Sequence, residues 1–445
     1  MKDLISRLRV DPDRDLKRLL EAMDNNGVSI LPTGMERHFE IARLKPAGFR
    51  NHDTVLGISI GGSNTKVILA SMRDGRLVIH HLAARANPLT KTHYTDYFDS
   101  FLFGDKAIRE YMSNSKDLCV GISVAVPIID GVPFHKHKIP TIEGLIARDY
   151  ERDAATHNIY ENMRAYLKER GVAVRSLFCQ FDSIVANYGG ASLSELGPDE
   201  KTMLLVCGTG LAAAIEQNTV SIGMADVFDK TLDDDTLLPF DLTEGHQYQY
   251  AIAGKGLYGL MERAVRLKAR EAGSKLQSFD PAVYFKTAYD TRSVVELWES
   301  TLGHGIMGKA KEILSEAGSD MFFELQDIAS AIVERAITGL ANCAAAAIYA
   351  DSSAGGKPHT VFFEGSIALN GNMLPRIKNE IIHRIGSSPA YDELNIPRPP
   401  VPLLCKTPMP VISDNAGIPE RELQQVDLTV KGAVTSAIAE DILKA

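Results

Sequence analysis

The feature that most constrains this fold is a strand, a glycine corner and a return strand, which occur twice. The first unit is TVLGISI, then Gly61-Gly62, then TKVILA, and the second is MLLVC, then Gly208-Thr209-Gly210, then LAAAIEQ. Glycine at such a corner permits positive φ and close approach of other groups to the backbone. The repetition predicts a duplicated fold with two glycine-cornered β-hairpins.

Helical and strand patterns alternate along the rest of the chain, which predicts an α/β fold class. Strands are expected where LCVGISVAVPI, RSLFCQFD and HTVFFEGS occur. The predicted helices begin after Pro12, lie around 95–112, 158–170 and 321–350, and close the chain at 428–445. No low-complexity linker separates these segments, so a domain boundary is expected at a chain crossing.

Composition limits the function classes. The 445 residues are 45% hydrophobic with a net charge of −9, which argues for more than one globular domain and against nucleic acid as a partner. Five scattered cysteines, an odd number, are expected to be reduced core thiols. The first residues have no apolar signal core, and no apolar run is expected to span a membrane. The expected compartment is therefore the cytoplasm.

The glycine corners are candidate phosphate sites, because bare backbone N–H groups can approach phosphate oxygens there. The first corner adds donors from Ser63 and Asn64, and the second is Gly208-Thr209-Gly210. The alternative is an ordinary hairpin turn that needs glycine for its backbone angles. Two such corners together favour phosphate binding.

Asp182 ends an apolar strand, where a carboxylate could accept a proton from an alcohol. The alternative is an N-cap for a helix beginning at Ser183. Gly365-Ser366 follows another strand and could lie against a nucleobase or sugar, although a plain turn explains it equally well. The run Asp233–Asp235 is interpreted as a solvated loop, with a metal role as the alternative, and no residue is assigned as a metal ligand.

This set of motifs resembles the eukaryotic-type hexokinase family within the actin-like ATPase superfold. LGISIGGSNTKVIL resembles the family's first phosphate motif, FDS its catalytic segment, VCGTG its second phosphate motif and FFEGS its adenosine motif. RLRVDPDRDLKRLL is similar to the family's opening helix, and IPTIEG to a segment after its sugar-binding loop. The resemblance extends over nearly the whole chain.

The resemblance implies two ribonuclease-H-like lobes around an interlobe cleft, with transfer of the γ-phosphoryl group of MgATP to a sugar hydroxyl. ATP and Mg²⁺ are the implied cofactors. The large lobe would comprise 1–52 and 181–428, and the small lobe 53–180 and 429–445. Asp182 would be the general base. The groups implied to hold the nucleotide are Gly61, Gly62, Ser63, Asn64, Gly208, Thr209, Gly210, Gly365 and Ser366.

The sequence departs from the family at several positions. The aspartate that helps hold hydrated Mg²⁺ in the family is Ser59 here, and two sugar-binding asparagines are replaced by Phe181 and Ala212. Each lost polar partner costs about 1–3 kcal/mol when its mate stays buried, so glucose is not expected to be the best acceptor. The expected sugar-side residues are His135, Lys136, Phe181, Ser183, Asp226 and Gln249.

Two functions therefore remain open. One is an ATP-dependent sugar kinase with altered acceptor preference, to which the retained Asp182 and both corners point. The other is a catalytically degenerate protein that binds sugar or nucleotide and acts as a regulator, to which Ser59 points. The expected partners are a small sugar and MgATP, without nucleic acid or membrane, and a homo-oligomer or regulatory partner is left open.

Overall fold

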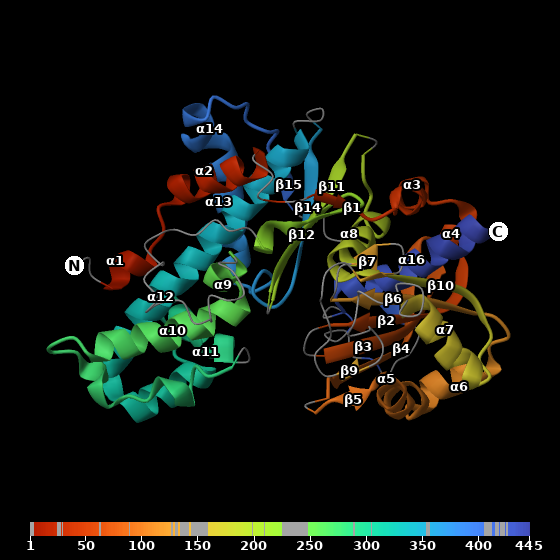
Figure 1. Cartoon of the computed structure of the whole chain (residues 1–445), viewed down its shortest axis with the longest axis horizontal. Coiled ribbons are helices and arrows are strands. Elements are labelled where there is room, and N and C mark those ends of the chain that lie inside the picture. The colour runs from red at the N-terminus through yellow and green to blue at the C-terminus, as the bar shows by residue number, and fades with distance from the viewer. Residues whose placement is uncertain are drawn as a thin grey trace.

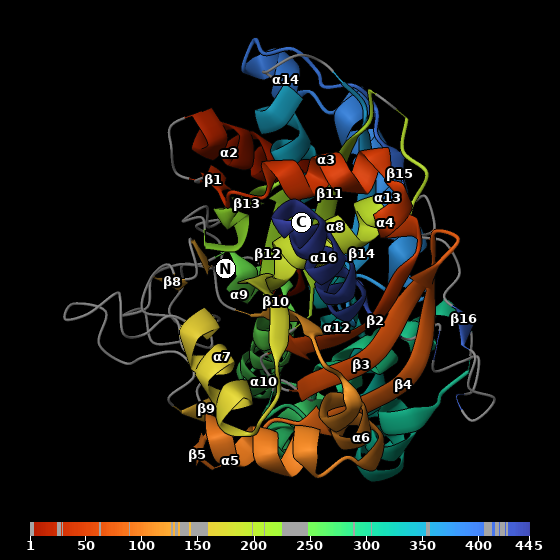
Figure 2. The same cartoon turned by 90° about the vertical axis from the view of Figure 1, so that its right-hand side faces the viewer.

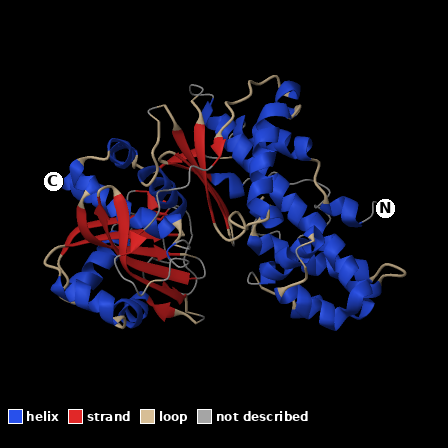
Figure 3. Ribbon diagram, turned by 180° about the vertical axis from the view of Figure 1, so that it is seen from behind, coloured by secondary structure: helices blue, strands red, loops and turns tan. Residues whose placement is uncertain are grey.

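The structure is a computed structural model in which helices and sheets alternate in layers (Figure 1). It describes all residues except 1–3, 25–27, 29, 62–63, 89, 126–127, 130–131, 134–141, 144–158, 198, 209, 225–247, 288–289, 304, 353–356, 405–411, 414–417, 419–422 and 424–425. The strands gather in two separate sheets with helices between and outside them (Figure 3). This is the mixed α/β architecture with two lobes that the sequence predicts.

The large-lobe sheet is built around the second glycine hairpin. Its strand order is β1 (Ile30–Pro32), β13 (Asn218–Val220), β12 (Leu211–Ile215), β11 (Lys201–Cys207), β14 (His359–Glu364) and β15 (Leu403–Leu404). Strands β11 and β12 form the predicted antiparallel hairpin, while β14 runs parallel to β11. The carboxyl ends of β11 and β14 therefore meet at one edge of this sheet.

The small-lobe sheet is built around the first glycine hairpin. Its strand order is β10 (Val174–Phe181), β6 (Leu118–Val124), β2 (His52–Ile60), β3 (Asn64–Arg73), β4 (Arg76–Ala86) and β16 (Ile412–Ser413). The predicted meander β2–β3–β4 is present, and β6 and β10 are parallel to β2. Short strand pairs lie apart from both sheets: β5 (Thr92–His93) with β9 (Ile142–Glu143), and β7 (Ile128–Ile129) with β8 (Val132–Pro133).

Each sheet shares a hydrophobic core with a group of helices on its outer side. On the large lobe these are α1 (Leu4–Leu8), α2 (Pro12–Asp24), α9 (Gln249–Ile252), α10 (Gly254–Ala269), α11 (Thr291–Glu299), α12 (Gly308–Ser352), α13 (Met373–Ser387) and α14 (Ala390–Glu393). On the small lobe they are α5 (Tyr94–Phe98), a π-turn (Asp99–Phe103), α6 (Lys106–Asn114) and α7 (Ile159–Glu169). Each outer layer encloses its own hydrophobic core.

A helix pair lies between the two sheets and joins the lobes. Helix α8 (Asp182–Ser192) packs on β11 and β12, α16 (Leu428–Lys444) packs on β2, β6 and β10, and the two helices pack on each other. The short helices α3 (Glu36–Leu44) and α4 (Ala47–Arg50) join this layer at the right of Figure 1 and in the upper half of Figure 2, below α14. A third hydrophobic core forms here, with residues from both sheets.

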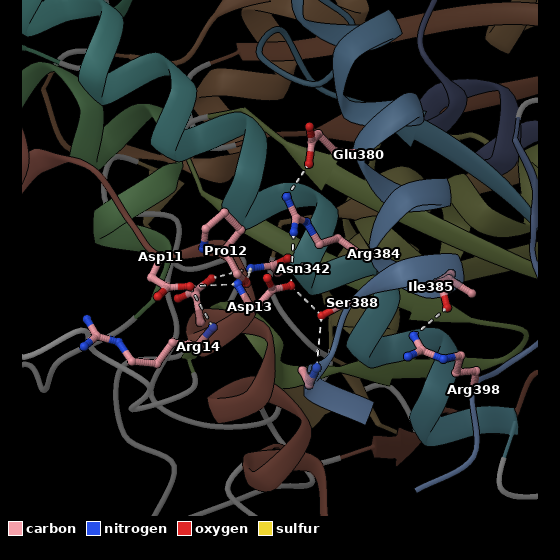
Figure 4. A network of polar contacts seen from close by, with 12 residues as sticks. Asp11, Pro12, Asp13, Arg14, Asn342, Glu380, Arg384, Ile385, Ser388 and Arg398 are labelled. Carbon is pink, nitrogen blue, oxygen red and sulfur yellow. Dashed lines mark hydrogen bonds and ion pairs between the residues drawn. The ribbon is translucent and has the colours of Figure 1, made fainter. Parts of the chain in front are cut away.

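A polar network holds the start of helix α2 against the rest of the large lobe (Figure 4). The Asp13 carboxylate accepts hydrogen bonds from Ser388 Oγ at 2.6 Å and Arg384 Nη1 at 3.3 Å. Asn342 of α12 donates to the Pro12 carbonyl at 2.9 Å and to Asp15 at 2.8 Å. Segments far apart in sequence are thereby held together at the start of α2.

Several sequence expectations can be compared with these elements. The four cysteines in the described residues, Cys119, Cys179, Cys207 and Cys343, are free and buried, as expected. The N-cap alternative for Asp182 is wrong, because α8 begins at Asp182 and Phe181 is its N-cap residue. Strand β16 pairs with β4 of the small-lobe sheet, although the sequence prediction placed 181–428 in the large lobe. The exact lobe boundaries stay a prediction.

One apolar segment needs a correction. Within the described residues, a stretch of α12 is long and apolar enough to cross a membrane, contrary to the expectation that no run would be. However, 89% of that window is buried inside the protein, as is typical of a core helix. Gly318, with φ of 75°, also interrupts the helical backbone of α12.

The contact between α8 and α16 depends on glycine. A Cβ atom at Gly432 would lie 1.8 Å from the Val185 carbonyl oxygen, and one at Gly189 would lie 2.7 Å from the Leu428 carbonyl oxygen. Both distances are far shorter than van der Waals contact, so the two backbones touch directly. Only glycine allows this close crossing.

Gly432→Ala should therefore lower the free energy of unfolding by about 3 kcal/mol, because the added methyl group forces the two helices apart. Gly386→Ala in α13 is the matched control, since a Cβ atom added there would meet nothing within 4 Å and alanine favours a helix by about 1 kcal/mol. Urea unfolding followed by circular dichroism measures both. Equal stability of the Gly432 variant and the wild type would contradict the close crossing.

Candidate functional site

The carboxyl edges of both sheets carry the glycine motifs. In the small-lobe sheet the corner after β2 is closed by a hydrogen bond from Gly61 N to Asn64 O at 2.9 Å. Asn87, at the end of β4, donates to the Gly61 carbonyl at 2.8 Å and accepts from Thr65 Oγ1 at 2.9 Å. Asn87 was missed by sequence reasoning, and it fixes the shape of the first corner.

The second corner lies at the corresponding edge of the large-lobe sheet. Gly208 N donates to Gly210 O at 3.1 Å, and Gly254 N, at the start of α10, donates to Gly208 O at 2.8 Å. Gln249, predicted on the sugar side, lies beside this corner, where its Oε1 accepts from Leu211 N at 3.5 Å. The N-terminus of α10 therefore meets the corner, and the Gly208 carbonyl oxygen accepts the first N–H group of the helix.

Gly365 packs directly against the second corner. Its φ is +92°, and a Cβ atom there would lie 2.4 Å from the Cys207 carbonyl oxygen. That carbonyl accepts hydrogen bonds from the N–H groups of Ile367 at 3.0 Å and Ala368 at 3.2 Å. Ser366 is exposed beside it. The two predicted nucleotide motifs of the large lobe are thus adjacent.

Asp182 lies where the small-lobe sheet meets the helix pair. It is the first residue of α8, directly after β10, and most of the residue is buried. Burial raises the pKa of Asp182 to about 7, the Asp427 carboxylate adds to the rise, and the N–H of Ser183 opposes it. A carboxylate with a pKa near neutrality suits general-base catalysis.

The N-terminus of α16 connects both carboxyl edges. Its N-cap residue, Asp427, accepts from Val430 N at 3.2 Å and from Thr429 Oγ1 at 2.7 Å, and it forms an ion pair with Lys66 of β3. Thr429 accepts a hydrogen bond from Ser59 Oγ at 2.9 Å. Asp427, Thr429 and Lys66 were not predicted as site residues.

Glu364, at the end of β14, reaches the same helix N-terminus from the large-lobe sheet. Its Oε2 accepts from Leu428 N at 2.8 Å. Burial and the Asp427 carboxylate raise the pKa of Glu364 to about 7, against hydrogen bonds from the N–H groups of Leu428 and Gly365. Burial lowers the pKa of Lys431, while Glu364 and Asp427 act in the opposite direction. Carboxylates and ammonium groups are thus concentrated at this junction.

The remaining predicted residues are placed as follows. Phe181 is partly buried and packs in the core between the sheets, while Ser183 is fully buried and its Oγ has no hydrogen-bond partner among the described residues. Ala212 lies in β12. Gly62, Ser63, Thr209, His135, Lys136, Asp226 and the run Asp233–Asp235 lie outside the described residues. The site-residue assignments accordingly stay predictions.

The chemistry of this junction can be stated from its groups. Glycine corners allow an anion to approach the backbone closely, and Lys66 and Lys431 are the basic groups at this junction. Asp182 offers a proton acceptor, and Asp427 offers a hard oxygen donor of the type Mg²⁺ prefers. The combination suits the binding of an anionic ligand beside a group that gives up a proton to Asp182.

Comparison with known proteins identifies the fold. No family model matches the sequence, and no curated protein matches it. Among solved structures, a hexokinase from Schistosoma mansoni complexed with glucose aligns over 98% of this chain and 97% of its own, with a TM-score of 0.64 and 13% identity. A second hexokinase structure aligns over the same shares with a TM-score of 0.61 and 15% identity. At this identity the likeness shows the fold, which is hexokinase-type and actin-like.

Because the pKa of Asp182 is raised, the difference in free energy of unfolding between the wild type and Asp182→Asn should depend on pH. In the folded chain Asp182 keeps its proton up to about pH 7, whereas in the unfolded chain it releases the proton near its ordinary pKa of 3.8. Its contribution therefore lowers the free energy of unfolding as the pH rises from about 4 to about 7. Asp182→Asn, which cannot titrate, should gain on the order of 2 kcal/mol relative to the wild type between pH 4.5 and pH 8.

The measurement is urea unfolding of both proteins at the two pH values. Only the change in their difference is interpreted, because other carboxyl groups, including Glu364, titrate in both proteins. A difference that is the same at pH 4.5 and pH 8 would show that Asp182 has an ordinary pKa.

Proposed function

On the premise of a hexokinase-type fold, we propose that this protein transfers the γ-phosphoryl group of MgATP to a sugar hydroxyl, with Asp182 as general base. The observation that carries the proposal is the position of Asp182. It lies at the carboxyl edge of its sheet, as the first glycine corner does, and the Asp427 side chain is near enough to raise its pKa. The solved structure of similar fold that contains glucose supports a sugar as the acceptor.

Each group at the junction would have its own role in the reaction. Asp182 accepts the proton of the attacking hydroxyl, which general-base action makes about 10²–10⁴ times faster. The glycines of both corners would let phosphate oxygens approach the backbone closely. Lys66 neutralises charge that develops on the transferred group. Mg²⁺, when bound, would neutralise charge on the phosphates, and Asp427, whose Oδ2 faces the Lys66 ammonium group, would be the residue that holds it.

The acceptor is proposed to be a sugar other than glucose. Phe181 and Ala212 offer no amide to a hydroxyl, and Phe181 instead packs among apolar side chains. A buried sugar hydroxyl left without a partner costs about 1–3 kcal/mol. A less hydroxylated sugar, or one with an amino or acylamino group, fits this surface better.

A regulatory protein that binds sugar or nucleotide without turnover is the second candidate. The observation that favours it is Ser59, whose neutral hydroxyl is engaged with Thr429. A hydroxyl cannot supply the charge of the aspartate that the hexokinase family is expected to have at this position. The two candidates differ in turnover and agree in ligand binding.

The decisive measurement is ADP release from MgATP with a panel of hexoses, amino sugars and N-acetyl sugars. We expect turnover with one class of sugar and a kcat/KM lower by about 10²–10⁴ in Asp182→Asn, because the general base is lost while the size of the side chain is kept.

Asp99→Asn is the matched control. Like Asp182, Asp99 directly follows the last residue of a secondary-structure element, here α5, but it pairs with Arg170 on the outer side of the small lobe. It should retain wild-type kcat/KM. Ligand binding by the wild type without turnover on any sugar would contradict the kinase and favour the regulatory candidate.

A further inference from the structure

Ser59 is connected to a carboxylate by two hydrogen bonds. Ser59 Oγ donates to Thr429 Oγ1 at 2.9 Å, and Thr429 Oγ1 donates to Asp427 Oδ1 at 2.7 Å. The chain of hydroxyl groups thus leads from β2 directly to the N-cap of α16. Ser59 carries no negative charge, but the Asp427 carboxylate supplies one close to it in space, although the two residues are distant in sequence.

The Asp427 carboxylate already attracts a cation. Its Oδ1 is used by the first turn of α16, whereas Oδ2 faces the ammonium group of Lys66. The Asp427 side chain is 16% exposed and the Lys66 side chain 26% exposed, so both remain accessible. Lys66 can therefore exchange this carboxylate for a phosphate oxygen when a nucleotide arrives.

An unpartnered hydroxyl lies next to this pair. Ser123 of β6 is directly opposite Ser59 in the parallel ladder, so both side chains point to the α16 face of the sheet. Ser123 is fully buried, and its Oγ has no hydrogen-bond partner among the described residues. A buried hydroxyl of this kind needs a hydrogen-bond partner, and the described residues do not provide one.

We propose that Asp427 replaces the missing aspartate and holds the Mg²⁺ of the bound nucleotide, with the hydroxyls of Ser59, Ser123 and Thr429 binding water of the hydrated ion. The proposal rests on the kinase or nucleotide-binding function proposed above. Mg²⁺ keeps several of its waters in protein sites and is bound through one or two carboxylates together with phosphate oxygens. One carboxylate beside several hydroxyls matches that requirement.

Glu364 is the weaker ligand of the two nearby carboxylates. Both of its oxygens accept backbone hydrogen bonds, from Leu428 N at 2.8 Å and from Gly365 N at 3.3 Å. Its side chain is 7% exposed and joins the large-lobe sheet to α16. Glu364 therefore positions the helix N-terminus that carries Asp427.

The test compares Asp427→Asn with the wild type. Asparagine is as good an N-cap as aspartate, so α16 keeps its first hydrogen bonds while the charge is removed. Asp105→Asn is the matched control, because Asp105 is also an N-cap, accepts from Ile108 N at 3.1 Å and pairs with a basic residue, His81, away from this junction.

Titration calorimetry with AMPPNP is run in Mn²⁺, in Mg²⁺ and in chelator, and electron paramagnetic resonance follows bound Mn²⁺. We expect the metal to strengthen nucleotide binding in the wild type and Asp105→Asn, and this gain to fall about 10–100-fold in Asp427→Asn with binding in chelator unchanged. The double variant Ser59→Asp/Asp427→Asn should regain the metal effect, since the charge returns to an adjacent position.

Full metal enhancement in Asp427→Asn would overturn this inference and leave the proposed function intact. Failure of the double variant to bind metal better than Asp427→Asn would also overturn it, even if the single variant is unstable. Absence of nucleotide binding by the wild type in every condition would overturn the proposed function and this inference together.

Discussion

The direct contact between the backbones of α8 and α16 is the constraint on which the rest of the structure depends. Gly432 lies against the Val185 carbonyl, and this contact allows one helix pair to fill the space between two sheets. Because each helix packs on a different sheet, the pair sets the position of one lobe relative to the other. Asp182, the first residue of α8, and Asp427, the N-cap residue of α16, are brought to the same junction as a result.

The electrostatics of the junction follow from that geometry. Carboxyl groups at the starts of two helices and at the end of β14 lie close together, and burial with the nearby Asp427 carboxylate raises the pKa of both Asp182 and Glu364. Lys66 and Lys431 balance part of this charge. Helix N-termini favour negative groups, which reduces the cost of assembling the cluster. A site of this kind can change its charge readily when an anionic ligand and a cation enter together.

Sequence reasoning predicted the parts of the fold whose signals are local. The meander β2–β4, the hairpin β11–β12 and the closing helix follow from apolar periodicity and from glycine between strands, and Asp182 follows from a carboxylate at the end of an apolar strand. Asp427 was missed because its role depends on the packing of α16 against β2 and β3. An aspartate immediately before a helix rich in small residues was a visible signal, but it predicts an N-cap and nothing about Lys66.

The position of β10 and β16 illustrates the same limit. Strand order depends on which parallel neighbour a segment joins, and the sequence pattern of a strand does not encode its partner. The expected lobe boundary at residue 181 falls at the end of β10, which is a strand of the small-lobe sheet. Side chains on the sugar side could be proposed only by resemblance, because their placement depends on loops between the elements.

The layer order has a consequence for how the chain is made. The small-lobe strands β2, β3, β4, β6 and β10 are synthesised long before α16, the helix that covers their inner face. Their inner face, with Val55, Ile68 and Phe178, therefore stays without its native cover while the rest of the large lobe, from α8 to β15, is translated. Contacts of such large sequence separation slow folding and leave apolar surface exposed on the nascent chain. Biogenesis of this protein should depend on chaperones during synthesis more than the stability of the finished molecule would indicate.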